Sequence, residues 1–294
     1  MLKQRIERNN ESSPKESSKS FFAGSYTFGD QQSGLLFGIR DLIAGILHTR
    51  LWLMLAANEM QTRYHRTIFG PIWVLVSFSV FLLVKIFIFT GMSGTDEDYY
   101  IAYLTMGLCV WYFITGAVGD GAAIFVRNST WILGIRTPYS LFIYSHVAFS
   151  LLNFVICLVP SYIIVFLYQS IDIGDILLSL FGSLLVAYCL TWIVLLLALL
   201  SVFMRDTIQL VITIMRVMFF LTPILWLPST IGAENAVFVF FNPIYHMIEL
   251  VRAPLLSGSI PMINLIVVLS ITIVMQTTAI VAFGLLRRWI PSYL

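Results

Sequence analysis

Residues 176–204 read ILLSLFGSLLVAYCLTWIVLLLALLSVFM, a run in which no side chain carries a charge. An α-helix needs about 20 apolar residues to cross the hydrocarbon core of a bilayer, so this run predicts a membrane-spanning helix. Outward along the chain, further stretches satisfy the same criterion. The six predicted spans are residues 69–91, 101–125, 139–168, 176–204, 207–228 and 262–286. The predicted fold is therefore an all-α membrane protein with six transmembrane helices.

The composition of the whole chain supports a membrane protein and argues against other classes. Of the 294 residues, 59% are hydrophobic and 11% are charged, and the mean hydropathy is +0.90. A soluble domain of this length needs more charge to cover its surface. The net charge of +2 and the lack of a Lys/Arg run argue against a nucleic-acid partner. Cys109, Cys157 and Cys189 lie apart within apolar runs, so neither a metal site nor a disulfide framework is predicted.

The basic residues indicate which side of the membrane each loop faces, because cytoplasmic loops are enriched in Lys and Arg. We place both termini in the cytoplasm. Of the 17 basic residues, all then lie on the inner side except Lys85 and Arg216, which fall within spans, and Arg252 in an outer loop. The opposite topology would place nearly all of them outside. We therefore expect a multi-pass protein with two cytoplasmic termini.

Two apolar segments differ from ordinary spans. Residues 37–64 have apolar residues at helical spacing with charges among them, which is typical of an amphipathic helix on the inner membrane surface; a short tilted span is the alternative. Residues 229–261 are too apolar for a loop in water and predict re-entrant or interfacial outer helices before the last span. The predicted domains are a disordered cytoplasmic tail (1–34), a cytoplasmic interface helix (35–67) and the six-helix transmembrane domain (68–294).

The junction before the first span reads RYHRTIFGPIW, from Arg63 to Trp73. It resembles the R-Y-x-R-(S/T)-x-x-G-P-x-W stretch of permeases in polysaccharide-exporting ABC transporters. Further stretches similar to this family follow in the family's order. They are Met106-Gly107-Leu108 in the second span, Arg205-Asp206 and Leu221-Thr222-Pro223-Ile224-Leu225-Trp226 at the two ends of the fifth, and Asn242-Pro243 followed by Glu249 and Arg252 in the outer loop. The resemblance covers residues 37–290 approximately.

The resemblance implies a type-2 ABC permease, the membrane subunit of an ATP-driven exporter in the bacterial inner membrane. Its substrate would be a lipid-linked polysaccharide, with O antigen first and capsular polysaccharide or teichoic acid as alternatives. Two permease copies would form a channel within the membrane lipids, and two copies of an ATPase subunit would bind ATP and Mg²⁺ beneath them. We expect no catalytic site, cofactor or metal in this chain, which has no Gly-Lys dipeptide for a Walker A loop.

By the same resemblance, the cytoplasmic segment 126–138 would contact the ATPase. Its predicted coupling residues are Arg127, Trp131 and Arg136. The segment departs from the family in the order of its Arg and Pro residues, so these residues are assigned by position.

Arg63 and Arg66 are the predicted substrate gate. The planar guanidinium group can bind two phosphate oxygens at once. These two residues would therefore meet the phosphate of the lipid carrier as it arrives from the inner leaflet. The alternative is contact with anionic headgroups of the surrounding membrane.

Charged residues within the predicted spans are the next candidates. Arg216 follows Asp206 in the fifth span by ten residues, which places it about 15 Å into the helix. An arginine at that depth is costly and should face protein or water. We expect Arg216 and Asp120 to line the channel, with a buried structural pair as the alternative. Lys85, near the outer end of the first span, is expected to reach the outer headgroups.

Aromatic residues make up 15% of the chain. Trp111, Tyr112, Phe219 and Phe220 are predicted to line the channel, because rings can stack weakly on sugars while a polymer slides past. The alternative is that they pack the protein or form an interfacial belt.

Two other functional classes remain open at this point. A membrane glycosyl- or acyltransferase would need carboxylates or histidines clustered near one membrane surface, and the four histidines are scattered. A secondary transporter would show inverted repeats and ionisable groups within the membrane. Arg216 and Asp120 alone do not make that case.

Overall fold

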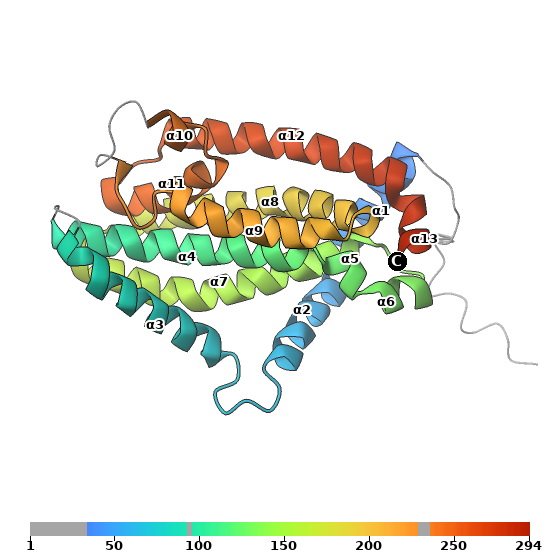
Figure 1. Cartoon of the computed structure of the whole chain (residues 1–294), viewed down its shortest axis with the longest axis horizontal. Helices are drawn as coiled ribbons and strands as arrows, with labels where there is room; N and C mark the ends of the chain where they lie inside the picture. Colours follow the sequence, from blue (N-terminus) through green and yellow to red (C-terminus); the bar gives the residue numbers. More distant parts are fainter. Residues whose placement is uncertain (1–33, 93–95, 229–235) are drawn as a thin grey trace, which may run out of the picture. The chain divides into compact units, whose positions relative to one another are not determined.

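The computed structural model describes residues 34–92, 96–228 and 236–294, and these residues form helices with no strand (Figure 1). The elements are α1 (Leu35–Leu47), α2 (Thr49–Arg63), α3 (Ile72–Phe89), η1 (Thr90–Met92), α4 (Glu97–Gly121), α5 (Ile124–Arg127), α6 (Ser129–Gly134), α7 (Ser140–Tyr168), α8 (Ile173–Phe203), α9 (Asp206–Leu221), α10 (Ala236–Phe240), α11 (Pro243–Ser257), α12 (Met262–Leu286), η3 (Arg287–Trp289) and α13 (Ile290–Tyr293). The all-α prediction is confirmed. Apart from Gly34, the predicted tail lies outside the described residues.

Five described helices are long and apolar enough to cross a membrane. They are α3, α4, α7, α8 and α12, the last continued by η3 and α13 to Tyr293. Each begins and ends within a few residues of a predicted span. A helix satisfies its backbone hydrogen bonds within its own segment, so apolar side chains are enough to let it span a membrane. The positions of these helices therefore follow from the apolar runs.

The predicted fifth span, 207–228, is too long at its end. Helix α9 stops at Leu221 and has 16 residues, so it is about 24 Å long at 1.5 Å per residue. Pro223 explains the stop, since the residue before a proline is driven out of the helical region. Thr222 accordingly adopts an extended conformation, with φ −89° and ψ 132°. Crossing of the membrane by α9 stays a prediction.

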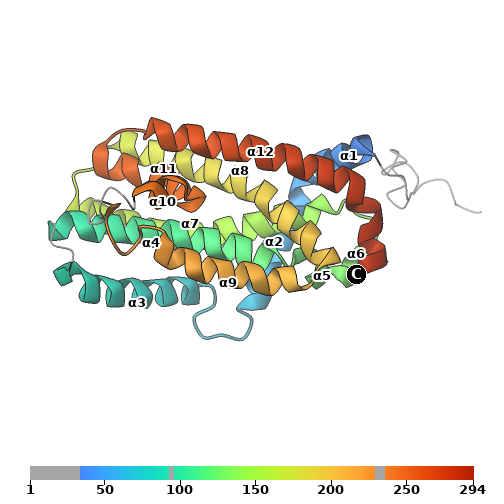
Figure 2. The same cartoon turned by 45° about the horizontal axis from the view of Figure 1, so that its top comes forward.

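The segment expected as one interface helix forms two. Helix α1 ends at Leu47, and the ψ of 47° at His48 breaks the helical path before α2 begins. The buried face of α1 contains Gly38 and packs against α12. A Cβ added at Gly38 would lie 2.6 Å from the Cα of Gly284, so only glycines allow this close approach. Figures 1 and 2 place α1 beside the end of α12, while α2 packs obliquely against α7 and leads away from the bundle to the α2–α3 connection.

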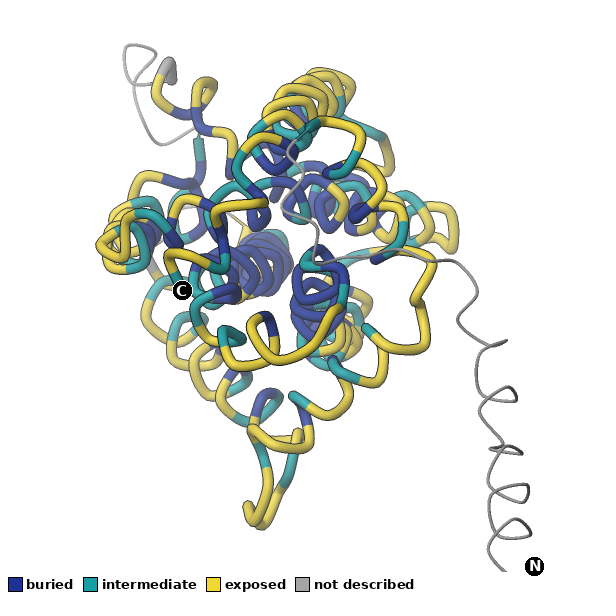
Figure 3. The backbone as a smooth tube through the Cα atoms, turned by 90° about the vertical axis from the view of Figure 1, so that its right-hand side faces the viewer, coloured by how far each residue is buried: buried dark blue, intermediate teal, exposed yellow. Residues whose placement is uncertain are grey.

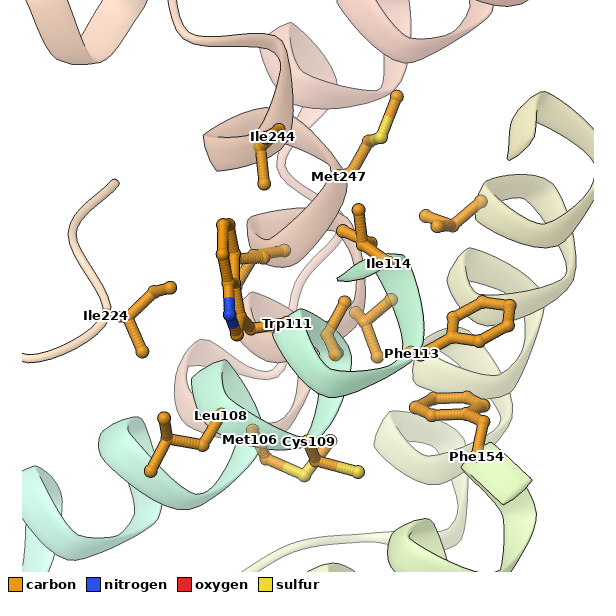
Figure 4. Close-up of a cluster of buried hydrophobic side chains, with 14 of the residues drawn as sticks. Met106, Leu108, Cys109, Trp111, Phe113, Ile114, Phe154, Ile224, Ile244 and Met247 are labelled. Carbon is orange, nitrogen blue, oxygen red and sulfur yellow. The ribbon is translucent and has the colours of Figure 1, made fainter. Parts of the chain in front are cut away.

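Helices α4 and α8 form the interior of the bundle. In the most apolar window of α4, 83% of residues are buried, against 17% in α3 and 17% in α12, which therefore lie at the periphery. Figure 3 shows the buried residues gathered on the central helices and the exposed ones on the outer faces. At the centre, Phe113 of α4 stacks on Phe154 of α7 at 4.6 Å between ring centroids (Figure 4).

The outer segment before the last span contains α10 and α11. Helix α11 packs against α4, α8 and α12. Asn242 caps it, because its side-chain oxygen accepts hydrogen bonds from the backbone N–H groups of Ile244 and Tyr245. Pro243 occupies the first turn, where its missing N–H has no cost. Short helices in this segment agree with the sequence pattern.

Candidate functional site

A cavity of about 550 Å³, here called the inner cavity, opens where α2, α3, α4 and α7 meet. Its walls are mainly aromatic. The lining residues are Arg63, Tyr64, Ser77, Phe78, Phe81, Trp111, Tyr112, Phe113, Thr115, Gly116, Asp120, Phe149, Ser150, Asn153 and Phe154. The buried amide oxygen of Asn153 has no hydrogen-bond partner among the described residues. It leaves an unpaired hydrogen-bond acceptor within the wall of this cavity.

Arg63 stands at the mouth of the inner cavity within a network of charges. Its guanidinium donates to Asp120 at 2.9 Å and to Glu59 at 3.3 Å. Glu59 also accepts from Arg127 at 2.9 Å. The Arg63 guanidinium lies over the ring of Phe149, 4.6 Å from its centroid. The side chains of Arg63 and Asp120 are 38% and 44% exposed, so water and ligands reach both partners.

The alternative of a buried pair between Asp120 and Arg216 is wrong, because Asp120 pairs with Arg63. Asp120 lies near the inner end of α4, within reach of Arg63 at the end of α2. Arg216 lies farther out along α9 and forms no ion pair or hydrogen bond within the described part of the chain. Pattern-based reasoning also missed Glu59, although its spacing of four residues before Arg63 on one helix is a signal for an ion pair.

A second cavity, here called the outer groove, has a volume of about 500 Å³. It is lined by Phe81, Trp111, Thr115, Gly119, Ile212, Met215, Arg216, Phe219 and Phe220. It shares Phe81, Trp111 and Thr115 with the inner cavity, so the same residues wall both spaces. Helices α3 and α9 flank α4 here (Figures 1 and 2).

The four aromatic residues predicted to line a channel all border these two spaces. Trp111 contributes to both, although its side chain is only 7% exposed. Its ring centroid lies 5.4 Å from that of Phe219. Tyr112 lines the inner cavity, and Phe220, 71% exposed, lines the outer groove. A channel-lining role for these residues stays a prediction.

Arg66 is separate from Arg63. It lies on the exposed α2–α3 connection and lines neither cavity. Its φ of 63° is in the left-handed region, which is uncommon for a residue other than glycine. Tyr64, two residues earlier, does line the inner cavity. Burial raises the pKa of Tyr64, so its phenol remains a neutral hydrogen-bond donor at the mouth.

The predicted coupling residues lie on the short helices α5 and α6 and just after them. A third cavity of about 400 Å³ lies between α2, α5, α6 and α7, and Glu59, Arg127 and Trp131 line it. The Trp131 side chain is 56% exposed, and Arg136 is exposed just beyond α6. Through Glu59, this surface is linked by ion pairs to Arg63 at the mouth of the inner cavity.

Three of the sequence motifs meet around the turn that follows α9. Arg252, fully buried, pairs with Glu249 and donates to the carbonyl oxygen of Pro223 at 3.3 Å. The amide of Asn242 donates to the hydroxyl of Thr222 at 2.9 Å. A Cβ on Gly107 would lie 2.9 Å from Arg252. These residues fix the turn that ends α9, so the structure gives them a supporting role.

No group of three or more His, Cys, Asp or Glu side chains in the described ranges is arranged to hold a metal ion. The buried carboxylate of Asp41 is used structurally. It accepts from Arg287 at 2.8 Å and from the backbone N–H groups of Tyr139 and Ser140 at the start of α7. Burial raises the pKa of Tyr139, whose ring lies under the Arg287 guanidinium, so it too stays neutral.

Comparison with known proteins places these features in a family context. Residues 50–256 match the family of ABC-2 type transporters. The chain is 26% identical over 189 residues to an O-antigen export system permease protein RfbA of Myxococcus xanthus, covering 63% of this chain and 72% of the relative. It is 24% identical over 222 residues to a protein of the same name from Klebsiella pneumoniae, covering 71% of this chain and 81% of the relative.

Proposed function

The chain belongs to the ABC-2 type transporter family, and from this premise we propose that it is the permease subunit of an ATP-driven exporter of a lipid-linked polysaccharide. O antigen is the first candidate, because the similar proteins of Myxococcus and Klebsiella are O-antigen export permeases by name. Capsular polysaccharide and teichoic acid are the alternative polymers. The proposed location is the bacterial inner membrane, with both termini in the cytoplasm.

The observation that carries the proposal is the shared wall between the inner cavity and the outer groove. Phe81, Trp111 and Thr115 belong to both, so one surface of rings and small polar groups extends from Arg63 to Arg216. Aromatic faces bind sugars weakly and without strict sequence preference. Weak, repeated contacts suit a polymer that must slide. In this proposal Arg63 receives the phosphate of the lipid carrier, and Arg66 assists from the α2–α3 connection.

The second copy of the permease would close this surface into a channel. Helices α3 and α9 expose apolar side chains next to the outer groove, among them Val80 and Phe220. In a monomer these side chains would meet only lipid. Two copies facing each other across these helices would enclose Trp111, Phe219 and Arg216 between them.

ATP and Mg²⁺ would be bound by two copies of a separate ATPase subunit. Trp131 on α6 and Arg136 just after it would contact that subunit, and the exposure of both side chains supports this. Movement there would reach the inner cavity through the Arg127–Glu59–Arg63 ion pairs. Closure of the ATPase would then shift packed helices between two discrete arrangements.

Reconstitution tests the proposal. Full-length chain and its ATPase subunit are placed in proteoliposomes loaded with lipid-linked O antigen, and delivery of glycan to the opposite leaflet is measured. Export should require both subunits and ATP hydrolysis. Transport driven by an ion gradient without ATPase would instead establish a secondary transporter. Transfer of sugar or acyl groups by the purified chain alone would establish the transferase alternative.

A further inference from the structure

Lys85 occupies an unexpected environment at the outer end of the outer groove. The sequence predicts that its ammonium extends to the outer headgroups. In the structure the Nζ atom lies 4.8 Å from the ring centroid of Phe81, 4.9 Å from that of Phe219 and 5.7 Å from that of Phe89. Phe81 and Phe219 are walls of the outer groove. Lys85 thus bridges α3 and α9 where this groove ends.

The positive charge of Lys85 is not balanced by an acid. Within the described ranges, Lys85 contacts rings but forms no ion pair or hydrogen bond, and the same ranges provide no such partner for Arg216. Asp120 is the one carboxylate that lines the inner cavity or the outer groove, and it is paired with Arg63. The outer groove is therefore lined by one cation, Arg216, and by no carboxylate, while Lys85 lies against two of its aromatic walls with its N–H donors free for a ligand.

The position of Arg216 is costly without a ligand. By helix rise, Arg216 lies about 15 Å from the start of α9, whereas Lys85 lies four residues, about 6 Å, before the end of α3. An unpaired cation within an apolar helix, such as Arg216, is rare and marks the path of an ion or substrate. An aromatic groove with one unpaired cation in its wall and another beside it is complementary to an amphiphile that carries an anionic group.

We infer that Lys85 and Arg216 form a second phosphate-binding position for the lipid-linked substrate, farther out than Arg63. This inference rests on the proposed function. A guanidinium binds two phosphate oxygens in its plane, whereas an ammonium acts as a compact point charge that tolerates a moving ligand. The phosphate would pass from Arg63 to this second position, while the aromatic walls hold the sugar.

Lys85 can be observed directly, because the other lysines, Lys3, Lys15 and Lys19, all lie in the N-terminal tail. Reductive methylation with ¹³C-formaldehyde keeps the positive charge and labels every lysine. Full-length chain in phosphatidylcholine nanodiscs is then titrated with farnesyl diphosphate, and Lys85→Arg identifies the Lys85 signal by its loss. Farnesol controls for the apolar tail, and nanodiscs with phosphatidylglycerol control for ordinary anionic lipid.

We expect the Lys85 signal to shift with farnesyl diphosphate and not with farnesol or phosphatidylglycerol. The affinity for farnesyl diphosphate is measured for every variant by isothermal titration calorimetry, because the Lys85 variants lack the labelled signal. It should fall about tenfold for Lys85→Met and for Arg216→Met, the effect expected for loss of a hydrogen bond to a charged group. Lys85→Arg should retain most of the affinity. Phe87→Met, at a position that is 88% exposed on the same helix and lines neither cavity, is the matched control and should leave affinity unchanged.

Other outcomes separate the inference from the proposed function. A shift with farnesol or with phosphatidylglycerol alone would make Lys85 a lipid contact and overturn the inference. So would diphosphate binding that depends on Arg63 but leaves Lys85 unaffected, and in that case the proposed function would stand. If the chain binds no diphosphate and exports no glycan, both fail together.

Discussion

Arg63 at the end of α2 donates a hydrogen bond of 2.9 Å to Asp120 near the inner end of α4, across 57 residues of sequence. The pair lies at the mouth of an aromatic cavity and is partly open to solvent. Exposed pairs contribute about 0–1 kcal/mol to stability. We therefore expect this pair to matter for substrate binding more than for stability. Asp120 would orient the Arg63 guanidinium and release it to an incoming phosphate.

A charge swap separates these roles. Arg63→Asp and Asp120→Arg should each reduce glycan export, the first by about tenfold through loss of a charged hydrogen bond. The double variant restores the ion pair but places a carboxylate where phosphate must bind. Export should therefore stay low in the double variant, measured as glycan at the cell surface. Recovery by the double variant would show that the pair is only structural.

The contact between Gly107 and Arg252 predicts a loss of stability on adding one methyl group. In Gly107→Ala the new Cβ would lie 2.9 Å from the Arg252 Nη1 atom and displace a fully buried guanidinium. Overpacking of this kind costs about 1–3 kcal/mol. The melting temperature of the purified protein in detergent should fall.

Gly116 provides the matched control for that substitution. It lies on the same helix, and a Cβ added there would meet no atom within 4 Å. Gly116→Ala should leave the melting temperature unchanged or raise it, because alanine favours a helix interior by about 1 kcal/mol over glycine. Equal melting temperatures for the two variants would contradict the packing at Gly107.

The buried ion pair between Asp41 and Arg287 predicts that substitutions at these two positions have non-additive effects on stability. Asp41→Ala removes the partner of Arg287 and also the acceptor for two backbone N–H groups at the start of α7. Leaving a buried charge unpaired costs about 3–5 kcal/mol. Arg287→Met in the same background removes that charge, so the double variant should be more stable than Asp41→Ala alone. Simple additivity of the two melting-temperature changes would argue against the pair.

The sequence predicted long apolar helices well and side-chain partners poorly, for physical reasons. Spans follow from apolar length, a property of one continuous segment. The early end of α9 was readable from Pro223, because the proline constrains Thr222, but hydropathy alone carried the predicted span past it. The partner of Asp120 was not readable, since Arg63 and Arg216 were both available cations and only the packing of α2 against α7 decides between them.

The motif residues show a related limit. Resemblance to a family selected Asn242, Glu249 and Arg252 without saying what they do. In the structure they hold the turn after α9 through Thr222 and the carbonyl of Pro223. For Lys85 the sequence predicted contact with the outer headgroups but not its contacts with aromatic rings. Its cation–π contacts with Phe219 require α9 to lie beside α3, and no local pattern reports that proximity.

The exposed surface at α6 leads to a last prediction, on coupling to the ATPase. Trp131→Asp and Arg136→Glu should leave the fold intact, because both side chains are exposed. Loss of an aromatic interface anchor of about 2 kcal/mol would weaken ATPase binding roughly 30-fold. Co-purification of the ATPase with each variant measures this. Tyr168→Asp, a similar change at the opposite end of α7, should not affect binding. Normal co-purification and normal glycan-stimulated ATP hydrolysis in both variants would place the ATPase contact elsewhere. A carboxylate introduced at either position would be buried without a partner if this surface bound the ATPase, and nothing else in these variants would compensate for it.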